Sequence, residues 1–407
     1  MRYPMRKLLP VLIAATTMIP LPTLAGGLWI NEFGAPAMGR AAAGAQTGSD
    51  DASAGLYNPA GMAYASGTQW MASGGLIAPK VEFDVDRGSI LNGTEDSGNA
   101  GSVVPSGSAF YTREIDDKWH FGANFYALTG NALDYDSDWA GRYQASEVSL
   151  FVLAVQPGVS YQVNDRVSVG ASVVLVYTEL EMKVAVPNPT TPLIGPDGSA
   201  KIEGDDFNVG YALGAVFELS DSTRLGMVYQ SELDAEYDGD AELDPAGLDV
   251  GIETELPLAA IFRLGLSHEF DDQLTGHMTL GWDDWSTLDS VNLSTQSNSA
   301  VLDRNWDDTY HFSLGASYRI DDSWQWQAGI AYDTSPVDAD DRTADLPIDR
   351  QVRYAFGVTH TRPDGVEISG SFVYADLGDA EIDALGYEGE YSSNEVIFTS
   401  VSFNWRM

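Results

Sequence analysis

"YHFSLGASYRIDDSWQWQAGIAY", residues 310–332, contains two runs in which apolar residues alternate with small or polar ones. Alternation with a period of two is the pattern of a β-strand whose two faces have different surroundings. The runs 310–319 and 324–332 are separated by the short polar connection 320–323, which is typical of a tight turn between antiparallel strands. The stretch therefore predicts a β-hairpin, and the same pattern recurs along most of the chain.

The two faces of these runs differ in a way that indicates a membrane. Apolar faces carry aromatic residues near the strand ends, for example Trp282, Trp324 and Trp405. The opposite faces carry Gly, Ser, Thr, Gln, His and Arg instead of the Lys and Glu of a solvated surface. A soluble β-sandwich also alternates, but aromatic belts over a small and polar inner face are typical of a transmembrane β-barrel.

The connections between the runs alternate between short and long. Short polar turns such as "EIDDKW" and "VNDRV" recur between longer segments, as in a barrel with tight turns at one rim and loops at the other. We expect the long segments near 86–105, 130–146, 187–204, 237–250, 290–305, 335–349 and 377–392. This spacing predicts an all-β fold, an antiparallel transmembrane barrel of about 14 strands over residues 67–407, an even number as such barrels require. Lipid demands closure, because an open sheet edge would leave backbone groups unpaired.

The N-terminus has the features of a secretory signal peptide. Three basic residues precede an apolar run at 8–20, and the small residues Thr23 and Ala25 follow it. We therefore expect residues 1–25 to be removed on export. The alternative is an N-terminal membrane anchor, but the run is short for a spanning helix.

Composition excludes several classes of partner. Removal of residues 1–25 leaves 18 Lys and Arg against 60 Asp and Glu, a net charge of −42. Such a surface repels phosphate backbones, so no nucleic-acid partner is expected. The chain has no Cys, and its acidic turns lack the ligand spacing and turn Gly of a calcium loop, so no metal and no cofactor is predicted. The acidic loops leave two explanations open, weak binding of divalent cations or a saline habitat.

Residues 26–66 precede the first strand and show no strand alternation. A barrel of about 14 strands is too wide for its wall side chains to fill, so it is either water-filled or plugged. The segment has few charges and carries apolar residues such as Phe33, Leu56 and Tyr57, which favours a plug in the lumen over a disordered periplasmic tail.

Two blocks of sequence resemble one family. The block 27–63 resembles the N-terminal hatch of the FadL/TodX family of outer-membrane transporters for hydrophobic compounds, and 328–357 resembles a strand-loop-strand near the end of the same family. The shared marks of the hatch are Asn31-Glu32-Phe33, Gly39-Arg40-Ala41, Asp50-Asp51-Ala52 and Asn58-Pro59-Ala60.

The resemblance implies a passive transporter in the outer membrane of a Gram-negative cell. Its substrate would be a long-chain fatty acid or a related hydrophobic compound that binds in the lumen and leaves sideways through the barrel wall. Uptake of neutral aromatic or aliphatic hydrocarbons by the same route, and a general diffusion porin, are the alternatives. The implied partners are outer-membrane lipid and lipopolysaccharide and the barrel assembly machinery.

The resemblance also places candidate residues for binding and gating. Pro59 fixes the backbone of the hatch motif, and Asn58 can hydrogen-bond a turn. A kink of the third strand is implied near Leu128–Gly130, although Gly130 could equally be an ordinary loop residue. The candidates are Phe33, Leu56, Asn58, Pro59, Ala60, Phe125, Tyr126, Leu128 and Gly130, with Lys183 and Arg304 as possible partners of a substrate carboxylate.

An enzyme is not predicted. The chain has five His, and His277 and His311 lie on inner faces near Ser and Thr. No nucleophile motif accompanies them, so polar lumen residues are the better interpretation and no catalytic residue is assigned.

Overall fold

The computed structural model describes residues 32–187, 196–244, 248–295 and 299–407. The predicted signal peptide and the first residues of the predicted plug, 26–31, lie outside these ranges, and the side chains of residues 128–131 are also not described. The helices of the described part are short 3-10 turns, none of them long and apolar enough to cross a membrane.

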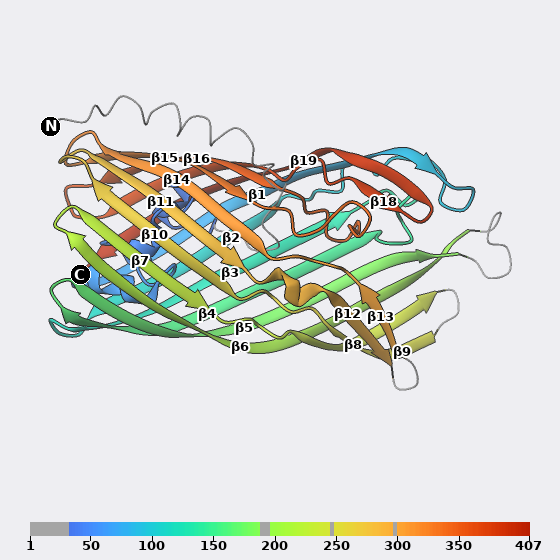
Figure 1. The fold of residues 1–407 in the computed structure, drawn as a ribbon, viewed down its shortest axis with the longest axis horizontal. Coiled ribbons are helices and arrows are strands. Elements are labelled where there is room, and N and C mark those ends of the chain that lie inside the picture. Colours follow the sequence, from blue (N-terminus) through green and yellow to red (C-terminus); the bar gives the residue numbers. More distant parts are fainter. Residues whose placement is uncertain (1–31, 188–195, 245–247, 296–298) are drawn as a thin grey trace, which may run out of the picture.

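The strands form one antiparallel sheet that closes on itself (Figure 1). Closure is made by the first and last strands, which pair from Gln69 opposite Arg406 to Gly88 opposite Tyr387. No edge of the wall is left open there, which satisfies the requirement that lipid places on backbone groups. The predicted closed antiparallel barrel is confirmed.

Nineteen strand segments make a wall of 14 strands. Four wall strands are interrupted near the rim, so that β7 and β8, β9 and β10, β11 and β12, and β13 and β14 each continue one another, while β18 is a short rim segment paired with β19. The segments are β1 (Thr68–Gly88), β2 (Val104–Glu114), β3 (Trp119–Asp134), β4 (Glu147–Asn164), β5 (Val167–Val186), β6 (Gly198–Ser220), β7 (Thr223–Gln230), β8 (Glu236–Asp244), β9 (Leu248–Glu255), β10 (Ile261–Glu269), β11 (Leu274–Asp283), β12 (Ser290–Thr295), β13 (Ser299–Asp303), β14 (Thr309–Arg319), β15 (Trp324–Asp333), β16 (Gln351–Thr361), β17 (Glu367–Asp376), β18 (Ile382–Ala384) and β19 (Tyr387–Arg406).

Alternation along the strands follows the wall as expected. In β15, Trp326 and Ile330 are exposed on the outer face, whereas Gln327 and Ala331 are buried on the inner face. The outer residues meet lipid, and the inner ones meet the contents of the barrel. The hairpin predicted from residues 310–332 is formed by β14 and β15 in register, with Leu314 opposite Ile330.

Four of the long connections were predicted wrongly, because they carry strands. β6 begins within 187–204, β8 and β9 occupy most of 237–250, β12 and β13 lie in 290–305, and β18 and the start of β19 lie in 377–392. These segments lengthen the wall toward the long-connection rim (Figure 1). The acidic β8, "EYDGDAELD", lacks the apolar alternation that marks a membrane strand, which indicates that this part of the wall lies outside the lipid.

Residues 32–66, here called the hatch, fold inside the barrel (Figure 1). They contain η1 (Pro36–Arg40), η2 (Ala45–Thr47) and η3 (Pro59–Tyr64), and a fourth such helix, η4 (Trp285–Leu288), lies between β11 and β12. The first three contact different parts of the wall, η1 at β14–β17, η2 at β7 and β10, and η3 at β3–β6. The prediction of a plug in the lumen is confirmed, and a disordered tail is excluded for residues 32–66.

Candidate functional site: the hatch and a gap in the barrel wall

Asn58 ties the hatch to itself and to the wall. Its side chain is fully buried and caps η3, where Oδ1 accepts a hydrogen bond from the Ala60 backbone N–H at 3.0 Å. The side-chain Nδ2 donates to the carbonyl of Gln46 at 2.8 Å and to those of Ala215 and Met227 at 3.2 Å. Pro59 occupies the first position of η3, where its missing N–H removes no helical hydrogen bond.

Two inward-facing glycines let the hatch approach the wall. A Cβ at Gly214 would lie 1.8 Å from Asn58 Oδ1, and one at Gly226 would lie 2.0 Å from the Gln46 carbonyl oxygen. Both contacts are far inside van der Waals distance, so the close seat of the hatch on β6 and β7 requires glycine at these positions.

A buried ion-pair network ties the start of the hatch to the opposite side of the wall. Glu32 Oε1 lies 3.4 Å from Arg353 Nε on β16. Arg353 also pairs with Asp333 on β15, and Asp333 Oδ1 lies 2.6 Å from His311 Nδ1 on β14. All of these side chains are buried, so removal of one partner would leave an uncompensated charge.

Phe33 lies between the hatch and the strand predicted to carry the kink. Its ring centroid is 5.0 Å from that of Tyr126 and 5.8 Å from that of Tyr57. Its backbone carbonyl accepts a hydrogen bond from Ser108 Oγ on β2 at 2.6 Å. Leu56 belongs to the same apolar cluster, so this end of the hatch packs against β2 and β3 together.

The wall has a gap between β2 and β3. Both strands lie in the described part of the chain. Their pairing begins with Glu114 opposite His120 and ends with Ala109 opposite Phe125. Beyond it, the next contact is an isolated bridge between Gly101 and Leu133. Residues 126–132 of β3 therefore have no backbone partner on the β2 side, although a barrel wall in lipid normally pairs every such group.

A β-bulge accompanies this gap on the other edge of β3. Opposite β4, Ala127 pairs with Leu153 and Thr129 with Val152, so that Leu128 has no partner of its own. Such a bulge bends its strand and increases its twist. The bulge falls at the start of the predicted kink region, whereas Gly130 is regularly paired with Phe151.

The candidate residues on β3 face different ways. Phe125, the last residue paired with β2, is 44% exposed on the outer face. Tyr126 is buried on the inner face, and its hydroxyl donates to Gln156 Oε1 at 3.0 Å. The side chain of Leu128 is outside the described part, and the gating role of Phe125, Tyr126, Leu128 and Gly130 stays a prediction.

The lumen wall beside the gap changes character along its length. At the level of η3 the inner faces of β3–β5 carry polar residues such as Asn124, Gln156 and Ser168. Further toward the long-connection rim they become apolar and join residues from the opposite wall and from 334–350. This apolar cluster includes Leu150, Val152, Ala154, Val174, Val176, Leu256, Leu258, Trp285, Leu288, Trp306, Val337, Leu346 and Ile348.

Sequence reasoning missed this apolar upper lumen. The available signal was the run Val148–Val155, in which nearly every residue is apolar while Leu150 and Val152 point inward and Phe151 and Val155 point outward. A strand that is apolar on both faces is bounded by an apolar environment on both sides. Here lipid is on one side and the apolar cluster on the other.

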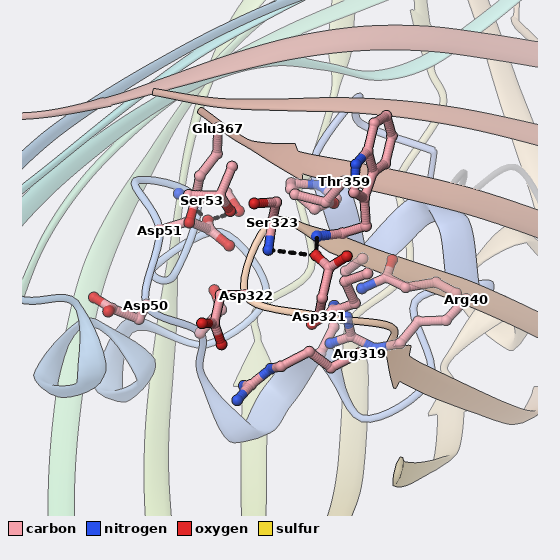
Figure 2. A pocket seen from close by; sticks show the side chains of 18 of the residues that line it. Arg40, Asp50, Asp51, Ser53, Arg319, Asp321, Asp322, Ser323, Thr359 and Glu367 are labelled. Carbon is pink, nitrogen blue, oxygen red and sulfur yellow. Dashed lines mark hydrogen bonds between the residues drawn. The ribbon is translucent and has the colours of Figure 1, made fainter. Parts of the chain in front are cut away.

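A cavity of about 380 Å³ lies between the hatch and the turn joining β14 to β15 (Figure 2). Charged and hydroxyl side chains line it, among them Arg40, Asp51, Asp321 and Glu367. Burial lowers the pKa of Arg40 to about 10, which leaves its guanidinium cationic at neutral pH. The cavity is at the short-turn rim and is too polar to suit an apolar ligand.

The two candidate carboxylate partners are both engaged with acidic residues. Lys183 Nζ lies 3.1 Å from Glu147 Oε1, and both side chains are partly exposed. Arg304 forms a two-pronged, buried pair with Asp345, at 3.0 and 2.7 Å. Within the described ranges, no group of three or more His, Asp and Glu side chains is arranged to hold a metal ion.

A closed 14-strand barrel with an internal hatch and a gap in its wall defines a class of plugged outer-membrane transport barrels. The model of the outer membrane protein transport protein family (OMPP1/FadL/TodX) matches residues 16–405, and the chain belongs to this family of non-enzymatic channels. The protein is therefore an outer-membrane protein of a Gram-negative cell.

Individual relatives cover nearly the whole chain. The long-chain fatty acid transport protein of Escherichia coli O6:H1 is 24% identical over 89% of this chain and 90% of its own length, and that of Salmonella typhi is 23% identical over 97% of each. A Pseudomonas aeruginosa FadL homologue has a similar structure, with a TM-score of 0.85, 20% identity and coverage of 93% of this chain and 99% of that one. The Pseudomonas putida toluene transporter TodX gives 0.67 at 19% identity, over 89% and 99% of the two chains. At these identities the solved structures show the fold alone.

Proposed function

We propose that this protein takes up hydrophobic small molecules passively, by binding them in the apolar upper lumen and releasing them sideways through the gap between β2 and β3. The observation that carries the proposal is the position of the gap. It opens where Tyr126 and Phe33 meet, beside the apolar cluster, while the hatch fills the lumen below. The exit thus connects an apolar interior to the lipid outside.

The lateral route agrees with the energetics of an apolar solute. Transfer of apolar surface out of water is favourable by about 25 cal/mol per Å², so the hydrocarbon layer is a better destination than the periplasm. A path through the hatch would lead past Asn58, Gln46 and the polar cavity, where an apolar solute gains nothing. We infer that Phe33, Leu56 and Tyr126 form the contact that must rearrange for passage.

The relatives suggest two substrate classes, long-chain fatty acids and related compounds or, alternatively, neutral aromatic and aliphatic hydrocarbons. The relatives from Escherichia coli O6:H1 and Salmonella typhi are named for long-chain fatty acid transport, and the solved neighbours include a toluene transporter. Outer-membrane lipid is the proposed acceptor. Lipopolysaccharide and the barrel assembly machinery remain the other partners that we propose.

Expression in a Gram-negative strain that lacks its own transporter of this kind tests the proposal. The labelled solutes are an alkane, an aromatic hydrocarbon and a fatty acid. For at least one of them, the initial rate of uptake should rise about tenfold over the empty-vector strain. This increase equals a lowering of the effective barrier by about 1.4 kcal/mol. The control is a folded outer-membrane barrel of another function, expressed in the same strain. Rates equal to the vector for every solute would contradict the proposal.

A further inference from the structure

The basic side chains of this protein fall into two groups, one at or below the hatch and one on the side of the long-connection rim. After the predicted signal peptide, every Lys and Arg lies in a described range, because 188–195, 245–247 and 296–298 contain none. Eight lie in the hatch or toward the short-turn rim, and ten lie along the lumen or toward the long-connection rim. The ten are Lys80, Arg87, Arg142, Lys183, Lys201, Arg263, Arg304, Arg342, Arg350 and Arg353.

Each of these ten has a carboxylate oxygen within 3.5 Å, supplied by the protein itself. Four of the ten, Arg263, Arg304, Arg342 and Arg353, are buried. Arg342 donates chiefly to backbone carbonyls and lies 3.5 Å from Asp349, whereas the other three each make two contacts with carboxylate groups. Arg263 pairs with Asp283 through two nitrogens, Arg304 does the same with Asp345, and Arg353 is held between Asp333 and Glu32. Their side chains are all buried, so water competes little for these pairs.

A carboxylate that entered the lumen would have to break one of these pairs or remain unpaired. Either outcome leaves a buried charge uncompensated, which is strongly unfavourable. The net charge of −42 also opposes the approach of an anion from outside. A neutral apolar molecule meets neither obstacle and gains from burial against the apolar cluster.

We infer that the lumen selects neutral hydrophobic molecules, such as hydrocarbons or esters, over ionised fatty acids. The inference rests on the proposed function and specifies its substrate class. Arg304 and Lys183, the candidates for a carboxylate partner, are committed to Asp345 and Glu147 instead. Selectivity then comes from the protein's own carboxylates, which occupy the positions that a fatty-acid head group would need.

A matched pair of ligands tests the inference on the purified full-length protein in detergent. Dibromostearic acid and its methyl ester differ only in the head group, and bromine quenches tryptophan fluorescence at short range. Trp285 and Trp306 both lie in the apolar cluster. Binding in the lumen is therefore measured as the part of the quenching that is lost in a Trp285→Phe/Trp306→Phe double variant. At about pH 8, where a carboxyl group is ionised, the ester should bind about tenfold more tightly than the acid.

The outcomes separate the two proposals. Binding of the acid as tightly as the ester would overturn the inference while leaving uptake of hydrophobic molecules intact. Binding of neither ligand would overturn the proposed function and this inference with it. An advantage of the ester that shrinks as the pH falls below about 4, where the carboxyl group of the acid becomes neutral, would support the head-group explanation.

The Asp345→Asn variant provides a gain-of-function test. It removes the partner of Arg304 and should raise affinity for the acid about tenfold without changing affinity for the ester. The matched control is Asp364→Asn, which removes the partner of Arg362 at the short-turn rim. An unchanged preference in a folded Asp345→Asn barrel would overturn the inference, and if that variant does not fold, the comparison of acid and ester on the unmodified protein decides alone.

Discussion

Deletion of Leu128 is expected to lower the initial rate of hydrophobic uptake about tenfold or more, which corresponds to at least about 1.4 kcal/mol in barrier. Leu128 is the extra residue of the bulge in β3, between the pairs Ala127–Leu153 and Thr129–Val152. Its removal restores a regular ladder with β4 and leaves the register with β4 unchanged on both sides of the deletion. The straightened β3 can then pair with β2 above Ala109, and the gap closes.

The control for this deletion is Leu128→Ala, which keeps the number of residues and therefore the bulge. Both variants should migrate as folded barrels before heating and as unfolded chains after it. The account predicts that uptake is lost in the deletion and retained in the substitution. Normal uptake by a folded deletion variant would show that the gap is not the exit.

Replacement of Asn58 by Ala is expected to loosen the hatch without preventing barrel assembly. The substitution removes a helix cap, worth about 1 kcal/mol, and leaves the carbonyls of Gln46, Ala215 and Met227 without this donor, at about 1–3 kcal/mol for a buried group. The wall strands keep their own ladders, because β6 and β7 are paired independently of the hatch. Single-channel conductance in planar bilayers should therefore rise from near closed to a measurable, fluctuating level.

The same contact can be disturbed from the wall. Gly214→Ala places a Cβ 1.8 Å from Asn58 Oδ1 and should produce the same leak, whereas Gly74→Ala, whose nearest neighbour is 3.9 Å away, should not. If the conductance rises in neither Asn58→Ala nor Gly214→Ala, other contacts hold the hatch in place. The Glu32–Arg353 pair is then the first contact to examine. Loss of the folded barrel would instead assign the motif to assembly.

Strand identity was readable from the sequence wherever lipid imposed alternation. Trp326 faces hydrocarbon and Gln327 faces the lumen, and the two residue types differ in polarity accordingly. Beyond the membrane that constraint ends. The sequence of the acidic β8 therefore predicts a loop, although its backbone pairs with β6 from Asp238 to Asp244 and with β9 from Glu236 to Leu243.

The gap was less visible, because pairing is a property of two strands. The region near Leu128 was singled out through the family resemblance, not through its own pattern. One local signal was present in β2, where Pro105 and Gly107 precede the last residue paired with β3. Proline cannot donate to a ladder and is confined to edges of sheets, so its presence in a wall strand indicates an interrupted pairing.

The ion pairs of the lumen could not be read from the sequence at all. Arg353 and Asp333 meet because β15 and β16 pair with Arg353 opposite Ala331, two residues from Asp333. A shift of register would separate them. The excess of acidic residues was evident from the composition. The pairing of each of the ten basic side chains along the lumen or toward the long-connection rim with a carboxylate depends, however, on how the strands and the 334–350 connection are placed.

The most direct test of lateral exit is to map where a substrate crosses the protein. A hydrophobic ester that carries a photoreactive diazirine is equilibrated with the protein in lipid vesicles, illuminated, and located by mass spectrometry of the peptides. The account predicts labels on the two sides of the gap, in residues 104–108 of β2 and 126–132 of β3. Labels concentrated instead around Arg40, Asp51 and Asp321, at the seam between hatch and wall, would show passage through the hatch and contradict the account.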